Sequence, residues 1–208
     1  MVLVYIFFMN YEIELKAHVD DRKNVISVLN GLGTYLGHTE KSDDYYHFSL
    51  KDRTAPDGRD FLSARIRKEK LTLDGKTENC CYFTYKRKEN KTGDDGTKIE
   101  VNEENEIKCT DASALEVFFA DLGAKIDLHK EKDVEHWNVV FEGETAHAEL
   151  CTVPPLGDFL EIEIIKNQND EQTVKKMKEI IIKIFEKCGL GKDKIEERYY
   201  RDMLQNGI

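Results

Sequence analysis

Charged and apolar residues alternate along most segments with β character, and this alternation restricts the folds open to the chain. In the segment YEIELK, Glu12, Glu14 and Lys16 share one face of a strand, and the residues between them are apolar. The same sorting recurs later in the pairs Arg65 and Arg67, Thr84 and Lys86, Lys130 and Lys132, and Glu161 and Glu163. In a single strand, such a pattern is typical of a sheet face exposed to solvent.

Helical periodicity marks three further segments. Apolar residues recur at spacings of three and four over residues 21–33, 111–123 and 173–188. The first two begin at an aspartate and end at a glycine, as helix starts and stops often do. A short last helix is expected over residues 194–204. All of these helices have apolar stripes that must cover a partner surface.

The β-type segments predict an α+β protein built on an antiparallel sheet of about eight strands. They span residues 11–18, 45–50, 63–73, 79–87, 126–132, 137–141, 145–153 and 159–165. The polar, glycine-bearing stretch 88–98 predicts a loop. The first two helices have equal length and each follows an E-x-E-x-K segment. This indicates a weak internal duplication, with halves of about 9–100 and 101–208, inside one domain that spans 1–208.

The charged strand faces could form a binding site if the sheet curls and closes beneath its helices. The apolar faces would then lie under the helices and the charged faces would turn inward. Burying that many charges without partners costs several kcal/mol per ion, so the interior must hold water and a ligand. Arginines and lysines on several strands suit a polyphosphate, and paired glutamates suit Mg²⁺ or Mn²⁺.

Composition excludes several other classes of protein. A net charge of −10 argues against broad nucleic-acid binding. The sequence lacks a run near the roughly 18 apolar residues of a membrane span. Five cysteines without a C-x-x-C pair are typical of a reducing compartment, so a cytoplasmic protein is expected. The start MVLVYIFFM does not fit a signal peptide, and leaves translation from Met1 or from Met9 open.

Motifs of other enzyme classes are absent from the sequence. The six histidines lack the H-E-x-x-H type of metal-ligand spacing, and each is expected to be an ordinary strand or loop residue. The chain also lacks a glycine-rich phosphate loop of the Walker or dinucleotide type, and a nucleophile triad has no support.

An ordered set of motifs resembles the CYTH superfamily, also called triphosphate tunnel metalloenzymes, which includes class IV adenylyl cyclases and thiamine triphosphatases. The resemblance covers nearly the whole chain. Its motifs are YEIELK at 11–16, DDYY at 43–46, ARIR at 64–67, TYK at 84–86, LGDFLEIE at 156–163 and YRDML at 200–204. E-x-E-x-K alone is common, whereas the ordered set is specific.

The resemblance implies a closed eight-stranded antiparallel β-barrel, a tunnel with a charged interior and helices packed outside. Carried over, the residues that bind Mg²⁺ or Mn²⁺ are Glu12, Glu14, Glu161 and Glu163. Those that bind the triphosphate are Lys16, Arg65, Arg67, Lys86, Lys130 and Lys132. In the hydrolase branch a tyrosine and a lysine help to activate water, which assigns catalytic roles to Tyr46 and Lys86. The family also implies that a homodimer can form.

The late LGDFLEIE and terminal motifs are most similar to the class IV adenylyl cyclase branch, which converts ATP to cyclic AMP and pyrophosphate. Three departures weaken that match. Lys132 stands where the family usually has arginine, 151–153 lacks a frequent aspartate, and Ile6 replaces a histidine. Hydrolysis of inorganic triphosphate, thiamine triphosphate or a nucleoside triphosphate is therefore the alternative. A non-catalytic protein that binds polyphosphate or a nucleotide is the second alternative.

Overall fold

The computed structural model describes residues 11–52, 54–55, 60–92 and 98–206, and for 86–92 and 98–104 the backbone alone. The strands are β1 (Tyr11–His18), β2 (Gly33–Ser49), β3 (Phe61–Leu73), β4 (Lys76–Thr92), β5 (Lys98–Cys109), β6 (Lys125–Phe141), β7 (Glu144–Val153), β8 (Gly157–Lys166) and β9 (Ile195–Glu196). The helices are α1 (Arg22–Leu32), α2 (Ser113–Asp121), α3 (Glu171–Lys187) and α4 (Tyr200–Asn206), with a 3₁₀ turn at Lys192–Lys194.

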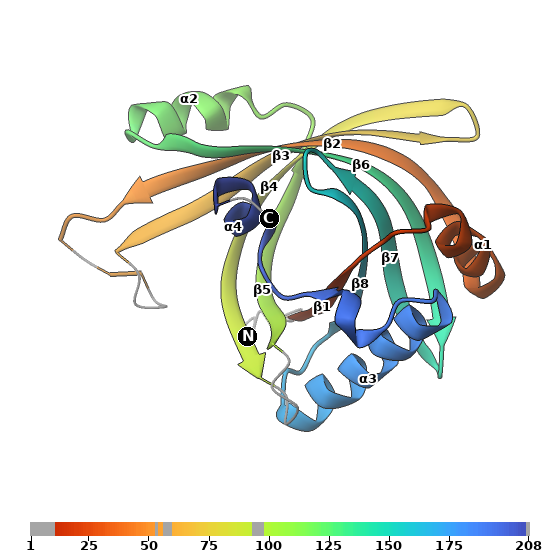
Figure 1. Cartoon of the computed structure of the whole chain (residues 1–208). Coiled ribbons are helices and arrows are strands. Elements are labelled where there is room, and N and C mark those ends of the chain that lie inside the picture. Colours follow the sequence, from red (N-terminus) through yellow and green to blue (C-terminus); the bar gives the residue numbers. More distant parts are fainter. Residues whose placement is uncertain (1–10, 53, 56–59, 93–97, 207–208) are drawn as a thin grey trace, which may run out of the picture.

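The strands form one antiparallel sheet in the order β5-β4-β3-β2-β6-β7-β8-β1-β9. β1 pairs with β8 along its whole length, from Tyr11 opposite Lys166 to His18 opposite Phe159. On its other edge β1 pairs with β5 over Tyr11 to Glu14, and with β9 after that. The sheet bends so that strands distant in sequence lie side by side (Figure 1). The predicted α+β class and antiparallel sheet are confirmed.

Some predicted element bounds are wrong. The stretch 88–98, predicted as a loop, lies largely in strands, because β4 continues to Thr92 and β5 begins at Lys98. Residues 93–97, between these strands, lie outside the described part. The segments predicted at 126–132 and 137–141 are one long strand, β6, so the strand count differs from the eight expected. The last helix begins at Tyr200, after the 3₁₀ turn and β9, instead of at residue 194. Ladder pairing with neighbouring strands outweighs the local polar composition in these segments.

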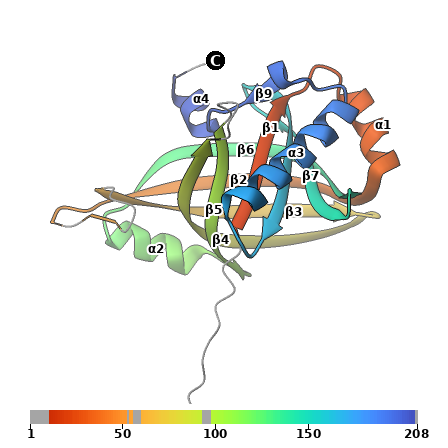
Figure 2. The same ribbon diagram turned by 90° about the horizontal axis from the view of Figure 1, so that it is seen from below.

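The main core lies between the apolar faces of the strands and the helices α1 and α3, which pack on the outside (Figure 2). Ile13 and Ile162 from the sheet meet Met177 and Ile181 of α3, and all four are almost fully buried. Full burial of a side chain of this size stabilises the fold by about 1.5–3 kcal/mol. Asp170 caps the N-terminus of α3, because its carboxylate accepts the Thr173 backbone N–H at 3.0 Å.

α2 covers a smaller core. Phe119 packs edge-on against Tyr46, with ring centres 5.1 Å apart. Asp111 accepts the Ser113 N–H, although the helix cap itself is Ala112. Phe118 and Leu122, which belong to the predicted apolar stripe, are exposed, so this stripe is buried only in part. Among the described residues, the structure has no helix with the length and apolar character of a membrane span.

Candidate functional site

The charged strand faces meet in one cavity of about 670 Å³. Nine of the ten residues that the sequence assigns to metal or triphosphate line it: Glu12, Glu14, Lys16, Arg65, Arg67, Lys130, Lys132, Glu161 and Glu163. For the tenth, Lys86, the structure describes the backbone alone. The residues that alternate with them, such as Ile13, Ile66 and Ile162, are at most 1% exposed on the opposite face. The period of two in a strand therefore places the ionic groups inside.

Asp43 organises one wall of basic side chains. Its carboxylate accepts Arg67 Nε at 2.6 Å and a second Arg67 nitrogen at 3.0 Å, which makes a forked contact. Lys130 Nζ lies 3.1 Å from the same carboxylate and Arg65 lies 3.9 Å from it. Burial alone would raise the pKa of Asp43, but the charges of Arg67, Lys130 and Arg65 hold it well below its usual range. One carboxylate therefore orients three cations.

A second cluster of charges joins β2, β6, β7 and β8. Lys132 Nζ donates to Glu161 at 2.6 Å and to Glu149 at 3.2 Å. Lys41 Nζ donates to the other oxygen of Glu149 at 2.5 Å. Burial would raise the pKa of Glu149, but Lys41 and Lys132 hold it well below the usual value, and Lys132 similarly lowers the pKa of Glu161 against its burial. Both carboxylates are therefore ionised at neutral pH.

The register of β1 and β8 brings glutamates of the two strands close together. Glu14 lies opposite Glu163, and Lys16 lies opposite Glu161, across β1 and β8. One oxygen of Glu161, Oε1, is buried and has no hydrogen-bond partner among the described residues. A buried carboxylate oxygen without a donor is costly unless a cation or water satisfies it. Carboxylate oxygens are the ligands that Mg²⁺ and Mn²⁺ prefer, so the residues present fit such an ion.

Tyr200 of α4 covers the basic residues from one end of the cavity. Its ring centre lies 5.1 Å from Lys130 Nζ, 5.4 Å from Lys132 Nζ and 5.4 Å from Lys16 Nζ. Its hydroxyl lies 3.5 Å from Cys151 Sγ. Burial, together with the nearby charge of Glu161, raises the pKa of Tyr200 well above its ordinary value. The neutral ring thus faces three ammonium groups, an arrangement that favours cation–π contacts.

Tyr46, to which the sequence assigned a catalytic role, does not reach this cavity. It lies on the outer face of β2, 6% exposed, against Phe119. Its neighbour Tyr45 lines the cavity instead, and its hydroxyl accepts a hydrogen bond from Lys130 Nζ at 3.1 Å. Burial would raise the pKa of Tyr45, but Lys130, Arg65 and Arg67 outweigh that effect and lower it. The alternation of faces explains this correction, because consecutive strand residues point in opposite directions.

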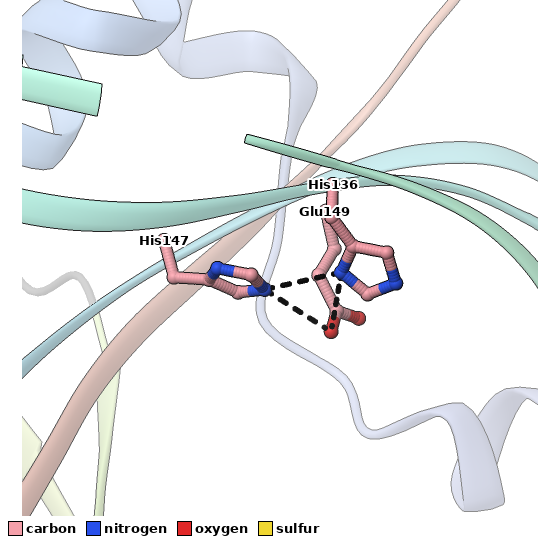
Figure 3. A group of neighbouring side chains, drawn as sticks. All are labelled: His136, His147 and Glu149. Carbon is pink, nitrogen blue, oxygen red and sulfur yellow. Dashed lines mark hydrogen bonds and ion pairs between the residues drawn. The ribbon is translucent and has the colours of Figure 1, made fainter. Parts of the chain in front are cut away.

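Several residues that line the cavity, or that contact its lining from behind, were missed in the sequence. Lys41 and Asp43 continue the inward alternation of β2, and His147 and Glu149 do so on β7. His136 of β6 lies opposite Glu149 in the register, next to His147 (Figure 3). The period of two beside the DDYY motif could have identified Lys41. The meeting of His136 with Glu149 depends on the offset between β6 and β7, which single-sequence patterns do not give.

Proteins similar to this chain are known from sequence and from solved structures. A relative named "Putative adenylate cyclase" from Methanocaldococcus jannaschii is 28% identical over 196 residues, covering 92% of this chain and 97% of its own. A solved structure from Pyrococcus horikoshii has a TM-score of 0.68 at 23% identity, covering 95% of this chain and 99% of that one. Another from Vibrio parahaemolyticus, described as a "putative adenylate cyclase", has a TM-score of 0.65 at 15% identity, covering 94% and 98%. The two structures share the fold.

The family model of the CYTH domain matches residues 10–200. That range contains the glutamates of β1 and β8 and the lysines and arginines that the sequence assigns to the triphosphate. The chain belongs to the CYTH family.

Proposed function

We propose that this protein binds a triphosphate with Mg²⁺ or Mn²⁺ in a closed tunnel and converts ATP to cyclic AMP and pyrophosphate. The observation that supports this most directly is the convergence of opposite charges in one cavity. Cations from β1, β3 and β6 face carboxylates from β1, β7 and β8. A triphosphate with its metal ion would complement both sets, which a neutral or purely cationic ligand would not.

The basic wall would position the phosphates. Arg65 and Arg67 offer forked donors, and Lys16, Lys130 and Lys132 act as point charges. Asp43 holds Arg67 in a fixed orientation before the substrate arrives. Orientation before binding lowers the entropic cost of gripping the phosphates, and donors aimed at the leaving group stabilise the charge that develops there. Lys86 is proposed to add a further cation from β4.

The metal would be held by Glu12, Glu14, Glu161 and Glu163. A bound divalent ion would supply positive charge that neutralises the charge developing on the leaving group. Lys132, which contacts Glu161 at 2.6 Å, is proposed to move from carboxylate to phosphate as substrate and ion enter together. Tyr200 would move with the lysines it covers, so that α4 closes over the bound triphosphate.

In the proposed reaction the ribose 3′-hydroxyl attacks the α-phosphorus in line. A bond forms from O3′ to the α-phosphorus, and the bond from that phosphorus to the bridging oxygen breaks. Pyrophosphate leaves, and the hydroxyl proton passes to solvent water. The names of the similar proteins from Methanocaldococcus jannaschii and Vibrio parahaemolyticus support cyclisation over other reactions of a triphosphate.

Hydrolysis of a triphosphate is the second candidate, and Tyr45 favours it. Its hydroxyl lies among the phosphate-binding cations, and their charges lower its pKa. A lowered pKa makes the phenolate form of Tyr45 easier to reach, and a phenolate can accept a proton from an attacking water molecule. Water would then attack the terminal phosphorus, and orthophosphate would be released.

Product analysis separates the two reactions. Purified protein is incubated with ATP, inorganic triphosphate or thiamine triphosphate, each with Mg²⁺ or Mn²⁺, and the products are resolved by chromatography. Cyclic AMP with equimolar pyrophosphate is expected. Orthophosphate without cyclic nucleotide would replace the cyclase by a triphosphatase, and binding of triphosphate without turnover would indicate a binding protein. Glu161→Gln should be inactive, whereas the matched change at exposed Glu131 should leave the activity intact.

A further inference from the structure

Two histidines and a glutamate converge beside the carboxylates of β8. His136 comes from β6, and His147 and Glu149 come from β7 (Figure 3). His136 Nδ1 lies 3.1 Å from His147 Nε2 and 3.6 Å from Glu149 Oε1, and His147 Nε2 lies 3.7 Å from the same oxygen. His136 is 8% exposed, and its other nitrogen, Nε2, is buried without a hydrogen-bond partner among the described residues. The ring therefore makes its polar contacts through the nitrogen that faces the cluster.

The three donor atoms form a triangle whose size fits one metal ion. Bonds of about 2.0–2.1 Å in a tetrahedral site place neighbouring ligand atoms about 3.3–3.4 Å apart. Of the observed separations, 3.1 Å is slightly shorter than that value, and 3.6 and 3.7 Å are slightly longer. Without an ion, the two imidazole nitrogens at 3.1 Å can share only one proton, so one lone pair always faces the cluster.

We propose that His136, His147 and Glu149 form a second divalent-metal site, which takes a nitrogen-binding ion such as Zn²⁺, Co²⁺ or Ni²⁺. Imidazole ligands suit these ions, whereas Mg²⁺ prefers oxygen. The site differs in its ligands from the glutamates assigned to the triphosphate metal. It lies next to them, because His147 is opposite Glu163 and Glu149 is opposite Glu161 across β7 and β8.

Two of the three ligands, His147 and Glu149, line the cavity. The remaining coordination positions of the ion would therefore face the cavity and take water or an anionic oxygen. Three protein ligands with an open position are typical of accessible zinc sites, whereas structural zinc sites use four.

Lys41 is the group that the ion has to displace. Its Nζ lies 2.5 Å from Glu149 Oε1, the oxygen that belongs to the triangle. A divalent ion would replace the positive charge that Lys41 supplies there. Lys41 has a second partner, since its Nζ also lies 3.9 Å from Glu69. The side chain can thus turn toward β3 and remain paired when the ion binds.

The displacement of Lys41 predicts how individual substitutions change the affinity for Zn²⁺. Lys41→Met keeps an unbranched side chain that is one atom shorter and removes the competing charge, so it should tighten Zn²⁺ binding. His136→Asn and His147→Asn should each weaken Zn²⁺ binding by about ten-fold or more, because each removes one ligand. His129→Asn is the matched control: His129 is an exposed histidine that bonds Asp44, outside the cluster.

The test titrates the metal-free full chain with Zn²⁺ by calorimetry and with Co²⁺ by visible absorption, without nucleotide. We expect one equivalent of each ion and a tetrahedral Co²⁺ spectrum. Both should be retained in Glu161→Gln, and binding should be weaker by about ten-fold or more in the two cluster variants. Histidine-selective nitrogen NMR of the unaltered protein should show two rings shifted by Zn²⁺, which removes any dependence on variant folding. Equal binding by the unaltered protein and both cluster variants, or no shifted rings, would overturn the proposal whatever the triphosphate assays give.

Discussion

Asp43→Asn should be among the most destabilising isosteric changes in this protein. The side chain is fully buried and contacts Arg67 at two positions, Lys130 at 3.1 Å and Arg65 at 3.9 Å. Removing one partner from a buried ion pair costs about 3–5 kcal/mol, because the remaining charge is left uncompensated. The cations of this wall face a cavity that admits water, so the lower end, about 3 kcal/mol, is expected. For a chain of this length that corresponds to a fall of about 6–12 °C in Tm.

The assay is chemical denaturation of metal-free protein at pH 7, with calorimetry for Tm. Asp44→Asn is the matched control, because Asp44 lies on the other face of β2 and bonds only His129 among the contacts described for it. A change at Asp44 should cost about 1 kcal/mol or less. Inorganic triphosphate should restore more stability to Asp43→Asn than to the unaltered protein, since phosphate charge replaces the lost carboxylate. Equal destabilisation by the two variants would refute the reasoning.

The dependence on pH follows from the same contacts. The folded-state pKa of Asp43 lies well below its usual range, so its contribution to stability is present above the unfolded-state pKa near 4 and is lost as the pH falls through the lower folded value. Asp43→Asn removes that contribution. The free energy of unfolding of the Asp43→Asn variant should therefore fall less steeply between about pH 5 and pH 2 than that of the unaltered protein.

Three further predictions concern other parts of the site. Glu161→Gln should lower metal-dependent turnover by about 10²-fold or more while the circular dichroism spectrum stays unchanged; full turnover would exclude Glu161 as a ligand. Tyr45→Phe should lower kcat by about ten-fold or more, whereas Tyr46→Phe should not change it, and the reverse order would restore the assignment to Tyr46. Hydrogen bonds from Arg198 lower the pKa of Glu196 from 4.5 to about 2, so the stability that Glu196 contributes is present above pH 4.5 and is lost toward pH 2; an acid unfolding curve that is identical in Glu196→Gln would contradict this.

Much of the site could be predicted because the side-chain period of a strand is fixed. Once Ile13 and Ile162 are assigned to the core, Glu12, Glu14 and Glu161 must face the other way, whatever the details of the fold. The catalytic role was assigned to Tyr46 instead of Tyr45 because a motif gives the position of a residue in the chain, but not the face of the strand on which it lies. Residues two apart in a strand share a face, so Tyr45 lies on the same side of β2 as Asp43.

The parts of the site that the sequence did not predict depend on the register between strands. His136 and Glu149 meet only because β6 and β7 pair with one particular offset. A shift of one residue would turn His136 to the other face. The exposure of Phe118 has a similar origin, since an apolar stripe on a helix indicates that a partner surface exists, but not how far the sheet beneath it extends. The internal duplication stays a prediction.

The pairing of β1 with β8 affects when the proposed site can form during synthesis. Tyr11 meets Lys166, so the first described strand stays without this neighbour until about 150 further residues have left the ribosome. Contacts this distant in sequence slow folding, because the intervening chain must be ordered first. The glutamates of the two strands stay apart until β1 and β8 pair, so a chain that ends before β8 would lack half of the glutamates proposed to bind the metal.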